Sequence, residues 1–334
     1  MNSKAQAATQ SDVARAAGVS RSLVSLALSG SPKVARETRE RIQVVAAKLG
    51  YRVNVSASSL ARRRSNIVGL VLPNLRNAFF ERVARCLGEA AQERGLTLFV
   101  TVGAEQPEVL HQGIESLLGV RVAGIILVSP WLPDADLLAI GEETPTCLIG
   151  RRTPGGRVDA VHIDEPTAAG LVVDHLTRLG AHTVAYIGPR VIDEASRDER
   201  ERALVAAAAS AGVALVAYDC DEDAGPAVRR AVEEHPEPLG LVMHNDGYAI
   251  DAVPVLAATP RPDAPVLLTS YDDTYLAERG EFALTSINQH DEALAHAAIE
   301  LLCGRAEGEK QTASARVITV APELVERASS RGHR

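Results

Sequence analysis

The first fifty residues carry apolar side chains at helical spacing in three short stretches. The buried faces that this spacing predicts are Val13, Ala16 and Ala17, then Val24, Ala27 and Leu28, and then Ile42, Val45, Ala46 and Leu49. Three short helices with small residues at the first crossing are typical of a helix-turn-helix unit. A small helical bundle with a solvated basic face also fits the spacing.

Polar and glycine residues mark the ends of these helices. Thr9, with Asp12 three residues later, predicts a capping-box start for the first helix, and Gly18 supplies the positive φ of a tight turn after it. Ser20 caps the second helix, and Gly50 ends the third. The capping residues therefore agree with the apolar spacing.

The second helix of such a unit enters the major groove of DNA by its N-terminal end. Its outward face here consists of Arg21, Ser22, Ser25 and Leu26. The Arg21 guanidinium can bond guanine O6 and N7 together, and Ser22 can bond a base or a phosphate. Leu26 offers only apolar contact, for example to a thymine methyl group. The sequence therefore predicts that this face reads bases.

Beyond residue 65 the pattern changes to near-continuous apolar runs separated by amphipathic helices. The predicted strands are Ile67–Leu72, Thr97–Val102, Gly124–Val128, Thr146–Ile149, Thr183–Ile187, Ala214–Tyr218, Leu239–Met243, Val266–Thr269 and Ala283–Ser286. The predicted helices between them include Phe79–Arg94, Pro166–Leu179, Glu199–Ala211 and Asp291–Cys303. Such alternation predicts parallel sheets covered on both faces, and the region is long enough for two of them, with a break near Asp164.

Open α/β sheets bind ligands outside the carboxyl ends of their strands. The loops at those ends supply seven candidate ligand-binding residues, which are Phe79, Phe80, Trp131, Ser196, Arg200, Asn245 and Asp272. Aromatic faces together with Arg, Asn and Asp suit a polar, ring-bearing ligand such as a sugar or a nucleobase. Each residue also has a structural alternative: a core position for one phenylalanine, a loop anchor for Trp131, a solvated helix face for Arg200 and a helix cap for Asp272.

The charge of the chain is divided unequally between these two regions. The whole chain has a formal net charge of -8, which alone argues against nucleic-acid binding. Residues 1–64, however, hold twelve Lys and Arg against three acids, a net +9, which leaves −17 for the rest. A basic end on an acidic body predicts that the end binds a polyanion.

The remaining composition argues against several other classes. The four cysteines, Cys86, Cys147, Cys220 and Cys303, are scattered and form no CxxC pair, so we expect reduced thiols, no metal site and no disulfide framework. The rival class is an enzyme on a doubly wound sheet, but the chain has no GxGxxG, GxxxxGK[ST], HExxH or GxSxG motif. A secreted sugar-binding protein shares the architecture, yet the start MNSKAQAATQ has no signal-peptide pattern and no apolar run approaches membrane-spanning length. We therefore expect a cytoplasmic DNA-binding protein that contacts no membrane and needs no cofactor beyond a small-molecule ligand.

Residues 54–64 (NVSASSLARRR) lie between the two regions and have few core-forming side chains. Leu60 is a lone apolar residue beside three arginines. An apolar wedge flanked by basic residues fits insertion into the minor groove, which kinks the duplex. A flexible linker fits the composition as well.

The chain resembles the lactose/galactose repressor (LacI/GalR) family of bacterial regulators. The stretch SDVARAAGVSRSLVSLALSGSPKVARETRERIQVVAAKLGYRVN resembles the family headpiece, and ASSLARRRSNIVGLVLPNLRNAFF resembles its hinge and first core strand. DHLTRLGAHTVAYIG, HND, SYDD and APELVERAS resemble later landmarks, so the likeness covers roughly residues 9–328. It implies a headpiece at 1–52, a hinge helix at 53–64, and a two-lobed periplasmic-binding-protein-like core at 65–334.

The resemblance implies roles for single residues. In the core, lobe one would take about 65–163 and 290–318, and lobe two about 164–289 and 319–329. Arg21, Ser22 and Leu26 would occupy base-reading positions, and Leu60 would enter the minor groove when two hinge helices pair. The full set of candidate DNA contacts is Thr9, Ser20, Arg21, Ser22, Ser25, Leu26, Thr38, Asn54, Ala57 and Leu60. All the effector candidates except Trp131, which follows from the strand-end rule, match effector-contact positions.

The resemblance also implies partners and shows departures from the family pattern. A homodimer would bind a near-palindromic operator, most often as a repressor, with a small-molecule effector in the cleft. The family often has Arg at Leu26, Pro at Ala78 and a capping residue such as Ser at Ala35. We therefore expect an atypical operator and a weakened phosphate contact near Ala35.

Overall fold

The computed structural model describes residues 8–28, 31–51, 65–103, 107–189, 195–306 and 314–331. The chain divides into two compact units, residues 1–65 and 66–334. The predicted Asn54, Ala57 and Leu60 lie outside the described residues.

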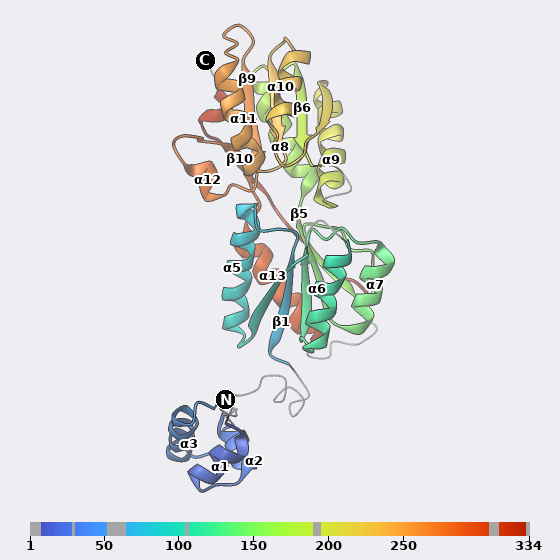
Figure 1. Cartoon of the computed structure of the whole chain (residues 1–334). Helices are drawn as coiled ribbons and strands as arrows, with labels where there is room; N and C mark the ends of the chain where they lie inside the picture. The colour runs from blue at the N-terminus through green and yellow to red at the C-terminus, as the bar shows by residue number, and fades with distance from the viewer. Residues whose placement is uncertain are drawn as a thin grey trace. The chain divides into compact units, whose positions relative to one another are not determined.

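The described residues of the first unit form three helices that make up the headpiece (Figure 1). Its helices are α1 (Gln10–Ala17), α2 (Arg21–Leu28) and α3 (Arg36–Lys48). The turn between α1 and α2 passes through Gly18 at φ 65°, where a side chain would be strained. The buried core consists of Val13, Ala14, Ala17, Val24, Ala27, Val34, Ile42 and Ala46.

Two apolar positions of the headpiece differ from the predicted pattern. Ala16 is exposed and Ala14 is buried instead, because α1 turns the i, i+1, i+4 face of Val13 toward its neighbours. Leu49 is 40% exposed, since α3 ends at this residue and the chain leaves the helical face there. The spacing rule identified the faces but not their edges.

Lobe one of the second unit is a six-stranded parallel sheet of order β11-β5-β4-β3-β1-β2. Its strands are β1 (Ile67–Leu72), β2 (Thr97–Val102), β3 (Gly124–Val128), β4 (Thr146–Ile149), β5 (Val158–Ile163) and β11 (Val317–Val320). Its helices are α5 (Ala78–Glu93), α6 (Pro107–Gly119), α7 (Asp134–Glu143) and α13 (Asp291–Ala306). Helices α5 and α13 cover one face, and α6 and α7 the other (Figure 1). The central strands β1, β3 and β4 are buried throughout, as expected for a sheet covered on both sides.

Lobe two repeats this plan with the order β12-β10-β9-β8-β6-β7. Its strands are β6 (Thr183–Gly188), β7 (Ala214–Asp219), β8 (Leu239–Met243), β9 (Val266–Tyr271), β10 (Thr285–Asn288) and β12 (Glu323–Val325). Its helices are α8 (Glu165–Arg178), α9 (Ala195–Ala211), α10 (Gly225–Glu234), α11 (Asp246–Ala258), the short α12 (Tyr275–Glu278) and a 3-10 turn, η1 (Ala328–Arg331). All strands are parallel except β12, which pairs antiparallel with β10.

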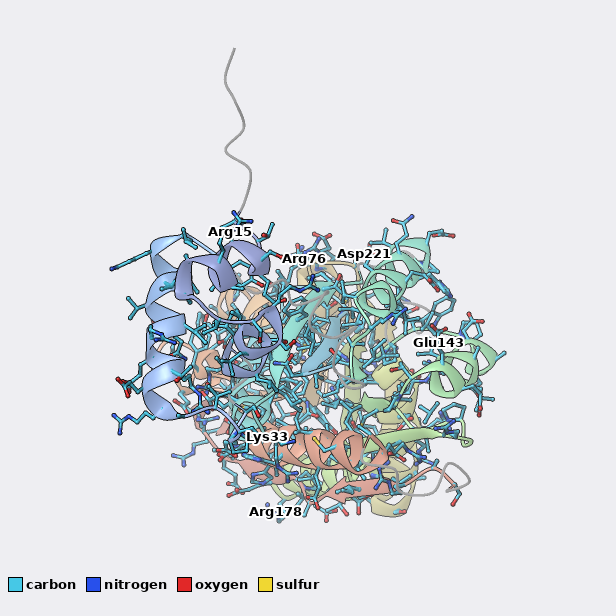
Figure 2. All side chains as sticks on the ribbon, turned by 90° about the horizontal axis from the view of Figure 1, so that it is seen from below. Arg15, Lys33, Arg76, Glu143, Arg178 and Asp221 are labelled. Carbon is cyan, nitrogen blue, oxygen red and sulfur yellow. The ribbon has the colours of Figure 1, made fainter. Side chains whose placement is uncertain are left out.

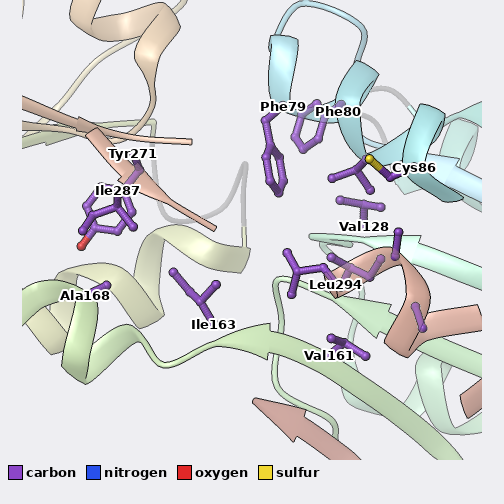
Figure 3. Packing of buried hydrophobic residues seen from close by; sticks show 14 of the residues in the cluster. Phe79, Phe80, Cys86, Val128, Val161, Ile163, Ala168, Tyr271, Ile287 and Leu294 are labelled. Atoms are coloured by element: carbon purple, nitrogen blue, oxygen red, sulfur yellow. The ribbon is translucent and has the colours of Figure 1, made fainter. Parts of the chain in front are cut away.

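Three short segments join the lobes. The chain crosses at Asp164 between β5 and α8, at residues 289–290 between β10 and α13, and at residues 321–322 between β11 and β12. One buried apolar cluster runs across this junction, from Phe79 and Leu294 to Tyr271 and Ile287 (Figure 3). The loops that follow the strand ends of both lobes therefore meet at one place.

The strand predictions hold with small shifts and three omissions. All nine predicted strands are present, and the largest shift is at β10, which starts two residues later than predicted because Ala283 lies in a turn with φ 40°. The sequence reading missed β5, β11 and β12. Strand β5 (VDAVHI) contains a buried aspartate, Asp159, that interrupts the apolar run. Asp159 lies there because the guanidinium groups of Arg305 and Arg316 bond its carboxylate at 2.5–2.8 Å.

Candidate functional site

The predicted base-reading residues share the solvent face of α2. Arg21, Ser22 and Ser25 are exposed, and Leu26 is 39% exposed. Val24 and Ala27 on the opposite face fill the headpiece core and fix the helix in place. At the start of α2, the backbone N–H of Leu23 donates to Ser20 Oγ at 3.2 Å, so Ser20 caps the helix as predicted.

The capping box of α1 engages Thr9 closely. Its hydroxyl donates to Asp12 Oδ2 at 2.6 Å, and the Thr9 N–H donates to the same oxygen at 3.0 Å. The hydrogen bond from the Thr9 side chain lowers the pKa of Asp12 below its usual value. Thr9 is exposed, and Thr38, the other candidate contact on this unit, is half-buried on α3.

Arg39 holds the loop between α2 and α3, a role that the sequence reading missed. Its Nη2 donates to the carbonyl oxygens of Ser31 at 2.6 Å and Val34 at 3.3 Å. Ala35, the first residue before α3, makes no side-chain capping bond. A half-buried guanidinium therefore orders the entry to a helix that lacks a side-chain cap.

A divided cavity lies where the strand-end loops of the two lobes meet. Its outer chamber measures about 370 Å³, within the ~300–1,000 Å³ range of small-molecule sites. Its inner chamber measures only about 20 Å³. Asn77, Ser129 and Asn245 line both chambers, so the two chambers are adjacent.

The structure brings all seven predicted effector residues to this cavity. Phe80, Trp131 and Asn245 line the outer chamber, and Phe79, Ser196, Arg200, Asn245 and Asp272 line the inner one. The rings of Phe79 and Phe80 lie side by side at the start of α5, with centroids 5.8 Å apart (Figure 3). Trp131 is the exception in exposure, at 42%, whereas the other six are buried. That these residues contact an effector stays a prediction.

Arg200 is the buried cation of the inner chamber. Its Nη2 donates to Glu165 Oε1 at 3.1 Å, its Nη1 donates to the His244 carbonyl at 2.5 Å, and the guanidinium lies 3.8 Å from the Tyr271 ring centroid. Burial opposes the charge of Arg200, but the Glu165 carboxylate, the Tyr186 and Tyr271 side chains and Asp272 together outweigh it, and the pKa of Arg200 lies above its ordinary value. The predicted alternative, a solvated helix face, is wrong for this residue, which is 3% exposed.

Asp272 faces the same chamber in a strained backbone position, with φ 98°. Asn77 Nδ2 donates to its Oδ2 at 2.9 Å, and Gln289 Nε2 donates to its Oδ1 at 2.5 Å. Burial, together with the nearby Asp246 carboxylate, raises the pKa of Asp272 to about 8, although Arg200 and the Asn77 amide oppose the shift. Because Asn77 belongs to lobe one and Asp272 to lobe two, this bond links the lobes.

Three further observations limit the chemistry of the described residues. Among these residues, no group of three His, Cys, Asp or Glu side chains could hold a metal ion. No helix in the described ranges is long and apolar enough to cross a membrane. Cys86, Cys147, Cys220 and Cys303 are free thiols.

Sequence comparisons match both units. A family model described as "Bacterial regulatory proteins, lacI family" matches residues 9–54, and a "Periplasmic binding protein-like domain" matches residues 173–330. The transcriptional regulator CelR of Thermobifida fusca is 30% identical over 315 residues, which cover 89% of this chain and 91% of CelR. The chain belongs to the lacI family. Another relative, the transcriptional regulator GalR of Escherichia coli K12, is 28% identical over 310 residues, 90% of each chain.

Solved structures agree with this assignment. A lac repressor dimer bound to operator and the anti-inducer ONPF superposes with a TM-score of 0.82 at 23% identity, over 98% of this chain and 100% of that one. A CelR–cellobiose complex superposes with a TM-score of 0.69 at 26% identity, over 96% and 99% of the two chains. The predicted fold and the predicted resemblance are thereby confirmed.

This lacI-family protein is a DNA-binding transcription regulator with an effector-binding α/β core. Its relatives are transcription regulators and not enzymes, so the alternative hypothesis of an enzyme on a doubly wound sheet is wrong. The sequence reading missed several residues of the regulator's cavity, chiefly Asn77, Glu165, His244 and Gln289. Asn77 was within a loop that the strand-end rule selected, and its place two residues before Phe79 as a helix cap was the available signal. Glu165 was hidden because β5, which precedes it, was not recognised.

Proposed function

We propose that this protein is a cytoplasmic homodimeric repressor whose affinity for a near-palindromic operator changes when a sugar occupies the interlobe cavity. The observation that carries the proposal is the exposed polar face of α2 in a unit of the lacI-family type. Residues 1–52 form the DNA-binding headpiece, 53–64 the hinge helix, and 65–334 the effector-binding and dimerisation domain.

The headpiece reads the operator with α2. Arg21, Ser22, Ser25 and Leu26 contact base edges because they share its solvent face. Thr9, Ser20 and Thr38 supply further contacts, with Asn54, Ala57 and Leu60 from the hinge. Leu26 replaces a polar reader with an apolar one, so the operator half-site has a thymine methyl where a guanine contact is common in the family.

The cavity receives a sugar. Phe79, Ser196, Arg200 and Asp272 surround its inner chamber with one aromatic face and a set of hydrogen-bonding groups, as sugar sites require. The CelR structure, which shares the fold at 26% identity, holds cellobiose. That relative supports a sugar rather than a nucleobase.

Ligand binding is coupled to the hinge through the arrangement of the lobes. Both lobes contribute to the cavity, and three crossover segments join them. A ligand that bonds groups of both lobes favours one lobe arrangement, and the hinges of the dimer follow it. Thermodynamic linkage then requires the operator to change sugar affinity by the same factor as the sugar changes operator affinity.

Selection of bound sites from random duplex DNA by the purified protein tests this function. We expect a near-palindrome whose affinity falls steeply between low and high salt, because phosphate contacts release counterions. We also expect a neutral sugar to change the affinity for that site. Enrichment of no sequence, with and without sugars, would contradict the proposal.

The hinge has its own test. We expect Leu60→Ala to reduce operator bending and operator affinity while sugar affinity measured without DNA stays unchanged. An unchanged bend angle, measured by the mobility of circularly permuted operator fragments, would show that Leu60 is not the wedge.

A further inference from the structure

The two chambers of the cavity differ in size and in the groups that line them. The inner chamber, at about 20 Å³, has room for little more than one water molecule, which needs ~10–15 Å³. The outer chamber is far larger, and Trp131, Tyr248 and Arg76 are among the residues that line it. A ligand that contacts the polar groups of the inner chamber must therefore place most of its bulk in the outer one.

We propose that the effector is an uncharged glycan of about two sugar rings, with a hydroxyl-bearing end in the inner chamber and its second ring against Trp131. This inference rests on the proposed function, because it specifies the class of sugar at the same site. It also assigns the outer chamber, rather than the inner polar network, as the determinant of ligand length.

The inner chamber holds a buried acceptor suited to a hydroxyl group. Glu165 Oε1 accepts from Arg200, but the other oxygen, Oε2, is buried and has no hydrogen-bond partner among the described residues. A buried carboxylate oxygen without a partner is costly, and a ligand hydroxyl that donates to it removes that cost. Asn245 uses its Oδ1 to accept from the N–H of Tyr248 at 3.0 Å, so its amide group can donate to a ligand oxygen.

The outer chamber holds a fixed aromatic surface. Trp131 lies on a short loop between β3 and α7, and Arg151 clamps that loop at both sides of the indole. Arg151 Nη1 donates to the carbonyls of Pro130 and Leu132, each at 2.7 Å, and its Nη2 pairs with Asp134 at 2.7 Å. A partly exposed indole on a backbone segment that is held at both sides suits the apolar face of a sugar ring. The clamp also argues against Trp131 as the loop's own anchor, since Arg151 already fills that role.

The charges around the outer chamber disfavour an anionic sugar. Among the described lining residues, Asp221, Glu222 and Asp251 face one guanidinium, that of Arg76, which pairs with Glu222. Arg76 and Asp221 are both labelled in Figure 2. A phosphate or carboxylate brought here would meet a surplus of negative charge at short range in a partly desolvated site.

The helix ends at the cavity do not offset this charge. The N-termini of α5 and α11 meet it, and such ends ordinarily attract anions. Asn77 and Asn245 cap them, however, and their Oδ1 atoms accept the N–H groups of Phe79 at 2.9 Å and Tyr248 at 3.0 Å. In the inner chamber the guanidinium of Arg200 is neutralised by Glu165. The site therefore favours hydroxyl groups over phosphate.

Calorimetric titration of the full-length protein with defined sugars tests the inference. The probes are D-glucose, cellobiose, maltose, lactose, sucrose and glucose 6-phosphate. We expect at least one two-ring sugar to bind about tenfold or more tightly than glucose, and glucose 6-phosphate to bind more weakly than glucose. Two-ring sugars that bind no better than glucose, or a phosphate ester that binds better than glucose, would overturn the inference.

Variants locate the second ring. We expect Trp131→Ala to weaken the two-ring sugar about tenfold and glucose less than twofold, since only the second ring reaches the indole. Leu179→Ala is the matched control, because Leu179 is also 42% exposed but lies outside the cavity, and it should change neither affinity. Equal losses for both sugars in Trp131→Ala would overturn the assignment.

The outcomes separate this inference from the proposed function. If glucose binds and the longer sugars do not bind better, the sugar-responsive regulator stands and the two-ring ligand is wrong. If none of the sugars binds, the proposed sugar effector and the two-ring inference are both wrong, whereas the DNA-binding regulator is still tested by the operator selection.

Discussion

The headpiece and the interlobe cavity present their recognition residues in opposite ways. On α2, Arg21, Ser22, Ser25 and Leu26 project from an exposed face, and the core beneath them is built from other residues. In the cavity, Arg200, Asp272 and Asn245 are buried and bonded to their neighbours. Substitutions on the α2 face can therefore change DNA specificity without changing the stability of the protein. In the cavity, the recognition groups also stabilise the fold.

Arg200→Ala is the substitution with the largest expected effect on this contrast. The substitution leaves the Glu165 carboxylate buried without its cation, so we expect a loss of about 3–5 kcal/mol in the free energy of unfolding. Chemical denaturation followed by far-ultraviolet circular dichroism measures it. The double variant Arg200→Met with Glu165→Gln is the control and should regain much of the loss. A loss of less than about 1 kcal/mol would mean that the pair is solvated and that the contrast is overstated.

The headpiece should respond in the opposite sense. Arg21→Ala should weaken operator binding by about 1–3 kcal/mol and relax the choice of base at one position, while the stability of the protein changes by less than about 0.5 kcal/mol. Arg15→Ala removes the same charge from an exposed site on α1 and should reduce specific and non-specific binding alike. Binding to the selected operator and to a scrambled duplex measures the ratio. An unchanged ratio in Arg21→Ala would show that Arg21 contacts only phosphate.

A smaller effect comes from the proton on Asp272. The pKa of Asp272 is about 8 in the folded protein and near the ordinary 3.8 in the unfolded chain. Between pH 3.8 and about pH 8, the folded protein therefore binds one proton at this residue that the unfolded chain does not. Its contribution to stability is complete below about pH 4 and is lost as the pH rises through 8. The charged groups facing it are Arg200, Asp246 and Asp291, and Asn77 and Gln289 bond its oxygens.

We therefore expect the wild type to lose stability with rising pH relative to Asp272→Asn. The difference should be on the order of 1 kcal/mol per pH unit between pH 5 and 7, where Asn mimics the protonated carboxyl. Asp291, whose pKa burial raises to about 6, is present in both proteins, so the comparison reports Asp272 together with its interaction with Asp291. Parallel pH profiles in denaturant titrations without sugar would contradict the assigned protonation state.

The same contrast explains how far the sequence could predict the molecule. Apolar spacing located nine strands and the three headpiece helices, because burial imposes a period on the chain. It missed β5, β11 and β12, where Asp159 or half-exposed edge positions break that period. A buried carboxylate looks like a loop signal until the two arginines that neutralise it, far along the chain, are known.

The candidate site divides in the same way. The strand-end rule selected all seven candidates from local position, and it alone supported Trp131. The family resemblance supported the other six, including Arg200 and Asp272. No local pattern predicts that Arg200 bonds Glu165 and the His244 carbonyl, or that Gln289 bonds Asp272. These contacts join segments that are separated in the sequence. Exposed recognition residues can be predicted from local sequence, whereas a buried network can be predicted only when the bonding partners of its residues are known.

The smallest predicted effect concerns two ion pairs that join the lobes. Arg76 pairs with Glu222, and both side chains are largely exposed, at 62% and 72%. Arg152 pairs with Glu199, whose side chain is 13% exposed and also accepts the Arg152 backbone N–H at 3.0 Å. Because solvent and salt screen exposed pairs, Glu222→Gln should change the free energy of unfolding by about 0.2–1 kcal/mol, and less at high salt. Glu199→Gln should lower the free energy of unfolding by more than Glu222→Gln does. The Glu199 side chain is less exposed, so water replaces its lost charge interaction with Arg152 less well. Denaturant titrations at low and high salt compare the two, and an equal or reversed order would show that exposure does not govern how these lobes are held together.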